Sequence, residues 1–446
     1  MYENPANAPS NKDLRPYKAP FEPGAGPFGT GGFPLYPNLA NTLAKAANHP
    51  DPDNVIPHVM ATCSAYAYAG FGQKGDPETV AMIMARMGLE ENRCRVFEQR
   101  VGAMYISSGA YLIQSKDHDV VILCYRGTQP EDIISILTDA DVAPERITVD
   151  LDGQKHYVHA GFYRNMRATR HLVMGALQRA AEGYSINRED PEEKKGDGFE
   201  ALYITGHSLG GAMAALMGVT LICEPRYQDI AKKLKAIYTF GQPMLGNQQF
   251  ARACENKKDT QGVRFLRDNL VRYIYNRDVV PRLPPRPVDE YAPFGREFQF
   301  DKELDAIGAA FSLAGDIADE VVAVPGDLVE GVGEAFNLTK NPLENLANLA
   351  GNIVSLPVNV LGHTLKWANS PLGRMGGWKE QKGKARSEQV QNLSGFAIVA
   401  PLASLAGRLD LTRTVPFKYS FKDHSPNHYV SALAPAGVWS EYGGQR

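Results

Sequence analysis

The sequence predicts an α/β protein whose central, mostly parallel sheet is wrapped by helices. Apolar strand-like runs alternate with helical stretches between residues 110 and 285, an alternation that is typical of parallel sheets covered by helices. The run Val120–Tyr125 is apolar at every position, as expected for a central strand that is buried on both faces. The stretch Tyr203–Ala212 has the pattern of an apolar strand, followed by a tight turn and a helix of small residues. We expect the rest of the chain to be organised around this stretch.

Local signals predict the individual elements along the chain. Asp76 followed by Pro77 is a helix start signal, and Gly88 is the stop signal of the same helix. The polar turn at 116–119 joins two β-rich runs, which indicates a hairpin. The expected helices are 38–47, 55–68, 77–87 and 163–181, and the expected strands are 110–114, 120–125, a run that begins at Glu200, 234–240 and 270–275.

Composition and charge are those of an ordinary globular protein. The 446 residues carry a formal net charge of −3, so there is no electrostatic argument for a nucleic-acid partner. The five cysteines are scattered without ligand-like spacing, which favours reduced, buried thiols, with one disulfide as the alternative. The beginning of the chain lacks the features of a signal peptide, which predicts a cytoplasmic protein or export by a signal-peptide-independent route. No apolar run has the length of a transmembrane helix.

Three parts of the chain differ in composition. Residues 1–37 are rich in Pro, Gly and Asn and are expected to form an extended or disordered arm. Residues 38–285 together with 416–446 are expected to form the α/β core. Residues 286–415 have apolar positions at helical spacing, so a largely helical insertion is expected there.

A serine stands at the apex of the turn in Gly206–Gly210. The pattern G-x-S-x-G is that of a nucleophile elbow, in which a strained strand-to-helix turn presents a serine hydroxyl above the sheet. The flanking glycines would let strand and helix approach each other without Cβ clashes. The pattern is weak evidence by itself, because a serine nucleophile also needs a base, a carboxylate that orients the base, and donors for the oxyanion.

Two further side chains stand in the order that α/β-hydrolases use, which is Ser, then Asp or Glu, then His. Asp278 directly follows an apolar strand, and His424 lies in the loop Asp423–Tyr429 near the end of the chain. The predicted catalytic residues are therefore Ser208, Asp278 and His424.

With these residues in place, the sequence resembles the class 3 lipase family, the group that contains the filamentous-fungal triacylglycerol lipases. The resemblance implies an α/β-hydrolase catalytic core with Ser208 as nucleophile, Asp278 as orienting acid and His424 as general base. It also implies an oxyanion hole formed by Thr128 and by the backbone N–H of Leu209. The motifs that carry the resemblance are Tyr125–Thr128, Val158–Phe162, Gly206–Gly211, Tyr238–Pro243 with Gly246 and Asn247, Asn276–Pro285, and His424 with Tyr429.

The same resemblance assigns three other histidines to alternative or structural roles. The family spaces its histidine five residues before a tyrosine, which matches His424 and Tyr429, so His428 is the alternative base. His159 and His207 are expected to be structural, and the side chain of His207 should point away from the site.

The resemblance implies an enzyme that cleaves carboxylic ester bonds of lipids through an acyl-enzyme. The implied partner is a lipid or ester substrate, at a membrane or lipid interface. Triacylglycerol lipase, phospholipase A1 and short-chain esterase are the alternatives within this class, and a lipase-fold binding protein without catalysis is the alternative outside it. No metal, nucleotide or redox cofactor is implied, and the oligomeric state stays open.

The sequence departs from the family in two ways. The family often has a tryptophan in a short lid after the oxyanion residue, and residues 129–137 contain none. The interval from Asp278 to His424 (424 − 278 = 146 positions) is longer than usual, so residues 286–415 are an insertion. Its helices either pack on the core or form a cap or lid that presents an apolar surface to substrate or membrane.

Overall fold

The computed structural model describes most of the predicted core and little of the predicted insertion. The chain divides into two compact units, and the account that follows is of the first, which contains the sheet. The predicted N-terminal arm up to residue 33, the predicted short lid at 129–137 and most of the predicted insertion lie outside the described residues. The described residues are 34–46, 55–69, 75–101, 106–128, 144–190, 194–284, 290–302, 376–390 and 422–434.

Within the described residues, the main sheet has eight strands in the order β1-β2-β3-β6-β7-β9-β11-β12. The pairs β1–β2 and β2–β3 are antiparallel, and the pairs β3–β6, β6–β7, β7–β9 and β9–β11 are parallel. The prediction of a mostly parallel sheet is therefore confirmed. The strands are β1 (Arg93–Val101), β2 (Ile106–Gln114), β3 (Val120–Arg126), β6 (Ala201–His207), β7 (Leu234–Phe240), β9 (Leu270–Tyr275), β11 (Arg296–Lys302) and β12 (Gly376–Gln381).

A second, smaller sheet and several short helical turns complete the described fold. The smaller sheet has the strand order β10-β8-β5-β4. Its strands are β10 (Tyr291–Ala292), β8 (Gly246–Asn247), β5 (Tyr157–His159) and β4 (Pro144–Arg146), and the 3-10 turns are Pro225–Tyr227, Val280–Arg282, Gly383–Ala385 and Lys422–His424.

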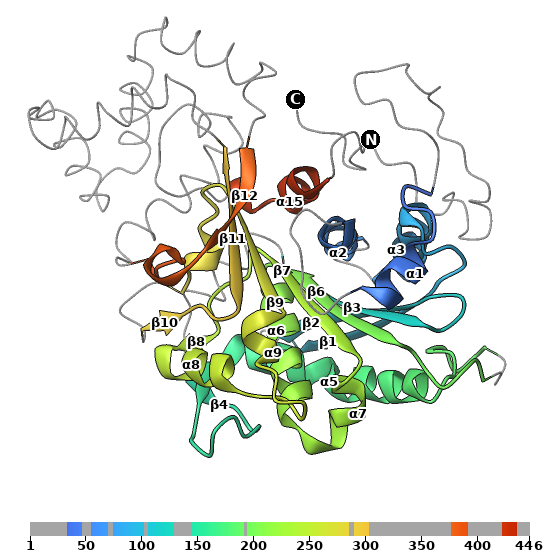
Figure 1. Ribbon diagram of the computed structural model, residues 1–446, viewed down its shortest axis with the longest axis horizontal. Helices are drawn as coiled ribbons and strands as arrows, with labels where there is room; N and C mark the ends of the chain where they lie inside the picture. Colours follow the sequence, from blue (N-terminus) through green and yellow to red (C-terminus); the bar gives the residue numbers. More distant parts are fainter. Residues whose placement is uncertain are drawn as a thin grey trace, which may run out of the picture. The chain divides into compact units, whose positions relative to one another are not determined.

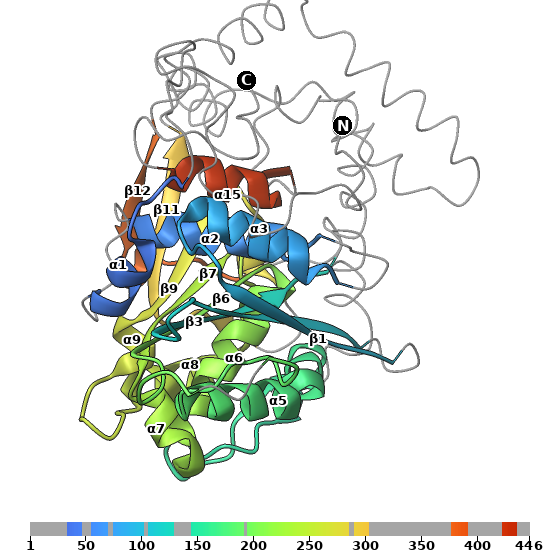
Figure 2. The ribbon, with the colours of Figure 1, turned by 90° about the vertical axis from the view of Figure 1, so that its right-hand side faces the viewer.

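Helices cover both faces of the main sheet. The first group is α1 (Leu39–Lys45), α2 (Val55–Tyr66), α3 (Pro77–Met87) and α15 (Pro426–Leu433), and the second is α5 (Ala160–Ala181), α6 (Leu209–Cys223), α7 (Gln228–Ala231), α8 (Gln248–Asn256) and α9 (Phe265–Asp268). The first group packs on one face and the second on the other (Figures 1 and 2). Along β3, Val121, Leu123 and Tyr125 belong to one core, and Ile122 and Cys124 belong to the other. The apolar run is thus buried on both faces, as predicted.

The predicted start and stop signals of α3 make the contacts expected of them. The Asp76 side chain accepts hydrogen bonds from the N–H groups of Glu78 (3.1 Å) and Thr79 (3.0 Å), which caps α3. Gly88 follows the last residue of α3 with a φ of 131°, a backbone conformation that side chains with a Cβ rarely adopt. The helix therefore begins and ends at the predicted residues.

The predicted bounds of the insertion are wrong at both ends. Within 286–415, residues 290–302 contribute β10 and β11, and residues 376–390 contribute β12, so these segments belong to the sheets. Strand β1 was not predicted either. The apolar side chains of β1 and β11 alternate with charged and amide residues, and this pattern resembles a solvated stretch until pairing partners are known.

A buried ion pair explains why charged residues occur inside this part of the sheet. Arg272 on β9 and Glu297 on β11 lie 2.6 Å apart, and both side chains are 1% exposed. Arg272 also donates to the carbonyl oxygens of Gln242 (3.1 Å) and Pro281 (3.4 Å). Glu297 accepts from the N–H (2.6 Å) and hydroxyl (2.8 Å) of Ser387. Burial lowers the pKa of Arg272 to about 10, so the guanidinium stays charged at neutral pH.

We expect the loss of one partner of this pair to cost more stability than the loss of both. In Glu297→Leu the guanidinium of Arg272 is buried without its carboxylate, which costs about 3–5 kcal/mol of unfolding free energy. The double variant Arg272→Met with Glu297→Leu removes both charges and should be more stable than Glu297→Leu alone. Urea denaturation measures both. The control is Arg296→Met, which breaks the more exposed pair with Glu380 and should cost about 0–1 kcal/mol. Equal stability of the single and double variants would contradict the expectation.

Two further predictions concern the whole chain. All five cysteines are free, and four of them are buried, which confirms the expected buried thiols. Burial raises the pKa of Cys254 well above its ordinary value, so this thiol stays protonated. No helix in the described ranges combines the length and the apolarity needed to cross a membrane.

Candidate active site

The turn between β6 and α6 has the geometry of a nucleophile elbow. β6 ends at His207, α6 begins at Leu209, and Ser208 between them has φ 61° and ψ −130°. A residue with a Cβ adopts this region at a cost of about 1–3 kcal/mol, and such strain is concentrated at functional sites. The Ser208 N–H donates to the Phe240 carbonyl oxygen at the end of β7 (2.8 Å), which holds the strained turn against the neighbouring strand.

The two glycines of the motif are required by close packing, as predicted. A Cβ on Gly206 would lie 2.3 Å from the carbonyl carbon of Gly210, which is on α6. A Cβ on Gly210 would lie 2.2 Å from the carbonyl oxygen of Tyr125, which is on β3. Larger residues at either position would therefore push the helix away from the sheet and move Ser208 with it.

Asp278 and His424 form a buried hydrogen-bonded pair. His424 Nδ1 lies 2.8 Å from Asp278 Oδ2, and the side chains are 3% and 0% exposed. The Val280 N–H donates to Asp278 Oδ1 (2.9 Å). The Tyr429 hydroxyl donates to Asp278 Oδ2 and accepts from the Tyr275 N–H (3.2 Å). Burial, followed by the neighbouring Asp278 charge, raises the pKa of Tyr429 well above its usual range, so the hydroxyl keeps the proton that it donates.

This pair lies beside the elbow. A Cβ on Gly241, which directly follows β7, would lie 2.8 Å from Asp278 Oδ2 and 2.8 Å from His424 Nδ1. Since β7 is the neighbour of β6, the pair and Ser208 share one edge of the sheet. Among the described residues, neither Ser208 Oγ nor His424 Nε2 has a hydrogen-bond partner. A base needs a nitrogen that is available for proton transfer, and a nucleophile needs an available hydroxyl. His424 Nε2 and Ser208 Oγ meet these two requirements.

The oxyanion candidates lie at the same edge. Thr128 follows β3 and is 5% exposed. Leu209 is the first residue of α6, so its N–H belongs to the first helical turn, where backbone donors have no intrahelical acceptor and the helix dipole favours negative charge. A Cβ on Gly127 would lie 2.7 Å from the His207 carbonyl oxygen, which shows that the segment of Thr128 contacts the elbow.

The other candidate histidines occupy different positions. His428, the alternative base, stacks on Tyr275 with 4.9 Å between ring centroids, whereas Asp278 is bonded to His424. His159 stacks on Phe162 at 4.0 Å and is completely buried. These stacked positions agree with structural roles.

Two contacts around His424 were not predicted from the sequence. Tyr429 was singled out in the sequence only for its spacing from His424, yet its hydroxyl donates a hydrogen bond to Asp278. Asp423 accepts from the Asn276 amide (2.9 Å) and from the Arg277 N–H (3.2 Å), which attaches the segment of His424 to the end of β9. The acidic residue beside His424 and the turn after β9 are the only hints that the sequence offered.

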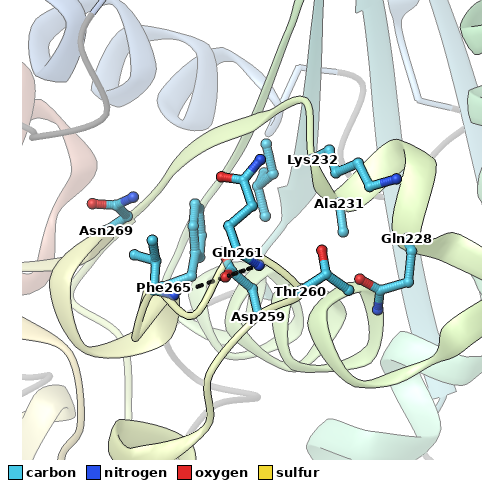
Figure 3. Close-up of a pocket in the computed structure, with 10 residues that line it drawn as sticks. Gln228, Ala231, Lys232, Asp259, Thr260, Gln261, Phe265 and Asn269 are labelled. Atoms are coloured by element: carbon cyan, nitrogen blue, oxygen red, sulfur yellow. Dashed lines mark hydrogen bonds between the residues drawn. The ribbon is translucent and has the colours of Figure 1, made fainter.

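A small surface hollow is lined by residues of α7, the start of β7 and the loop before α9 (Figure 3). Its volume is about 150 Å³, and it is lined by residues at the start of β7 and β9, including Leu234 and Asn269. The candidate residues lie at the opposite, carboxyl ends of the strands. The Asp259 carboxylate in the hollow accepts from the N–H groups of Gln261 and Val263 (both 2.9 Å), so it stabilises its own loop. Among the described residues, no group of three or more metal-binding side chains occurs.

Comparison with known proteins agrees with the geometry. Residues 122–288 match the family model described as Lipase (class 3). This match includes Thr128, Ser208 and Asp278, and His424 lies outside it. Triacylglycerol lipase OBL1 of Arabidopsis thaliana is 29% identical over 196 residues, which cover 38% of this chain and 35% of the relative. A lipase of Rhizopus niveus is 30% identical over 185 residues, which cover 40% of this chain and 38% of the relative.

These relatives are matched over part of their length only. The chain spans less than two fifths of the length of either. Among solved structures, lipase II from Rhizopus niveus is similar with 23% sequence identity and a TM-score of 0.41, over 56% of this chain and 82% of that chain. The family model and the sequence relatives together show that the part of the chain around residues 122–288 is similar to the class 3 lipase family.

Proposed function

We propose that this protein is a serine hydrolase that cleaves carboxylic ester bonds of lipids through an acyl-enzyme. The observation that carries the proposal is the buried hydrogen bond between Asp278 and His424 (2.8 Å) at the sheet edge that holds the Ser208 elbow. A base oriented by a carboxylate beside a strained serine is the arrangement that nucleophilic acyl transfer needs.

In this mechanism the Ser208 Oγ attacks the carbonyl carbon of the ester. His424 Nε2 takes the hydroxyl proton, and Asp278 stabilises the imidazolium and holds the ring through Nδ1. The oxyanion accepts hydrogen bonds from Thr128 and from the Leu209 N–H, and each such donor contributes about 3–4 kcal/mol to transition-state stabilisation. His424 then gives its proton to the leaving alcohol. A water molecule, activated by the same nitrogen, hydrolyses the acyl-enzyme and releases the fatty acid.

The relatives support a lipid substrate. Those described above are named triacylglycerol lipase and lipase, which favours a triacylglycerol over other esters. Phospholipase A1 and short-chain esterase use the same chemistry and differ in the leaving group and acyl chain only. A lipase-fold binding protein without catalysis would not need a base hydrogen-bonded to a buried carboxylate.

A substrate panel tests this choice. We expect hydrolysis of long-chain triacylglycerols, with a rate that rises when the substrate passes its solubility limit and forms an interface. The measurement is fatty acid release from triacylglycerols, phospholipids and short soluble esters, with Ser208→Ala as the blank. Preference for short esters without a rise at the solubility limit would indicate an esterase. Preferential release from phospholipids would indicate phospholipase A1. Labelling of Ser208 by a fluorophosphonate probe is expected in each case, and its failure in the folded protein would favour the binding protein.

A further inference from the structure

The residue before the nucleophile contacts the backbone of the base. His207 Nε2 lies 2.7 Å from the carbonyl oxygen of His424, across a sequence separation of 217 positions. His207 Nδ1 lies 2.8 Å from the Tyr68 hydroxyl. The His207 ring is 3% exposed, and its centroid lies 4.5 Å from that of the His424 ring. The side chain expected to be merely structural therefore connects the elbow to the segment that carries the base.

These two contacts determine which nitrogen of His207 carries the proton. A carbonyl oxygen can only accept, so Nε2 must be the protonated nitrogen that donates to His424. In a neutral imidazole the other nitrogen is then an acceptor, and the Tyr68 hydroxyl donates to it. Burial, followed by the nearby His424, holds the pKa of His207 well below its usual value. Burial also raises the pKa of Tyr68, so this hydroxyl keeps the proton that it donates.

Tyr68 is wedged between the elbow and the strand that precedes Thr128. A Cβ on Gly127 would lie 2.1 Å from the Tyr68 hydroxyl and 2.7 Å from the His207 carbonyl oxygen. The hydroxyl thus occupies the space that a side chain at 127 would need. A hydrogen-bonded chain runs from this position through His207 to the backbone of His424.

We propose that His207 is a positioning residue, whose neutral Nε2–H holds the backbone of His424 in place relative to Ser208. The proposal rests on the proposed function. Ser208 follows His207 directly in the chain, so a single dipeptide presents the nucleophile and holds the base. The contact is to the carbonyl oxygen of His424, so it occupies neither ring nitrogen of His424.

A neutral His207 also suits the chemistry of the base. His424 becomes a cation when it takes the serine proton, and a second cation with its ring 4.5 Å away would oppose that step. The titratable groups that face His207 are Tyr68, from the turn after α2, and His424 and Tyr429, from the C-terminal segment. Both tyrosines have raised pKa values, so at neutral pH they are uncharged, as His207 is.

Two variants of similar polarity separate the two hydrogen bonds of His207. In His207→Gln the amide nitrogen can replace Nε2 and donate to His424, whereas in His207→Asn the amide reaches only as far as Nδ1 and loses that donor. We expect His207→Asn to lower kcat by ~10²-fold, as a displacement of about 1 Å in an active site can, with little change in KM. His207→Gln should retain kcat within about tenfold. Equal losses in the two variants, or full turnover in His207→Asn, would overturn the proposal.

His118→Gln is the matched control. His118 is a buried histidine whose Nδ1 bonds to the Gly183 carbonyl oxygen (2.9 Å) at a hairpin turn. Its replacement by glutamine makes the same chemical change at a different site. We expect kcat within about twofold of the unaltered protein, and a loss as large as that of His207→Asn would assign the effect to general destabilisation.

A spectroscopic measurement tests the protonation state without using turnover. In ¹⁵N-histidine-labelled protein at neutral pH, the signals that vanish in His207→Gln should be those of a neutral ring protonated at Nε2. A ring protonated at Nδ1, or a cationic ring, would overturn the proposal whatever the turnover of the variants. Turnover retained in Ser208→Ala would overturn the proposed function and this inference together. A dead Ser208→Ala beside a fully active His207→Asn would overturn this inference alone.

Discussion

Ser208→Ala should lose ~10⁶-fold in kcat, because removal of the nucleophile from a Ser–His–Asp unit abolishes covalent catalysis. The fold should persist. Alanine is smaller than serine, and the Ser208 hydroxyl makes no hydrogen bond to a described residue, so the substitution leaves no donor or acceptor unpaired. Ester hydrolysis measures the loss, and circular dichroism with thermal unfolding verifies the fold.

A second buried serine provides the control for Ser208→Ala. The Ser115 hydroxyl accepts from the Val120 N–H (3.0 Å) at the turn before β3, at the opposite end of that strand from Thr128. Ser115→Ala should keep the turnover of the unaltered protein and its labelling by a fluorophosphonate probe, whereas Ser208→Ala should lose both. Near-full hydrolysis by a folded Ser208→Ala protein would contradict the mechanism.

The second large effect is expected for Asp278→Asn, with a loss of ~10⁴-fold in kcat. His424 Nδ1 donates its proton to Asp278 Oδ2 (2.8 Å), and this fixes Nε2 as the unprotonated nitrogen. Asparagine can present an amide N–H there, which favours the opposite tautomer and removes the base. The negative charge that stabilises the imidazolium is lost as well.

The neighbouring carboxylate supplies the control for Asp278→Asn. Asp423 accepts from Asn276 and Arg277, and its side chain attaches the loop of His424 to the end of β9. Asp423→Asn keeps the acceptor oxygen and should lower kcat by no more than about tenfold, since it can disturb only the position of the loop. The measurement is kcat for hydrolysis of a soluble ester in both variants. Losses of similar size would show that orientation of the loop, rather than the tautomer, dominates.

Much of the core could be predicted because its signals are local. The apolar run of β3, the capped start of α3 and the elbow at Ser208 each depend on steric and hydrogen-bonding demands within a few residues. The elbow shows this at Gly206, where a Cβ would lie 2.3 Å from the carbonyl carbon of Gly210, four residues along the chain, and such a demand leaves a readable pattern. The strand ends that carry Thr128 and Asp278 followed from the rule that parallel strands end at one edge.

Elements that depend on distant partners could not be predicted. β11 contains Glu297, whose burial is acceptable only because Arg272 pairs with it across the sheet. Without that partner a glutamate among phenylalanines predicts a solvated segment. The same holds for β12, which joins β11 after a long interval of chain.

By itself, the sequence determined the sheet class, the elbow and the order of Ser208, Asp278 and His424, because each of these follows from residue type and local spacing. Only the tertiary structure decided how the base is held. Tyr429 bonds to Asp278, and His207 bonds to the backbone of His424 across 217 positions. The physical reason is that a hydrogen bond between distant segments depends on where the fold places two atoms, and no short stretch of sequence specifies both.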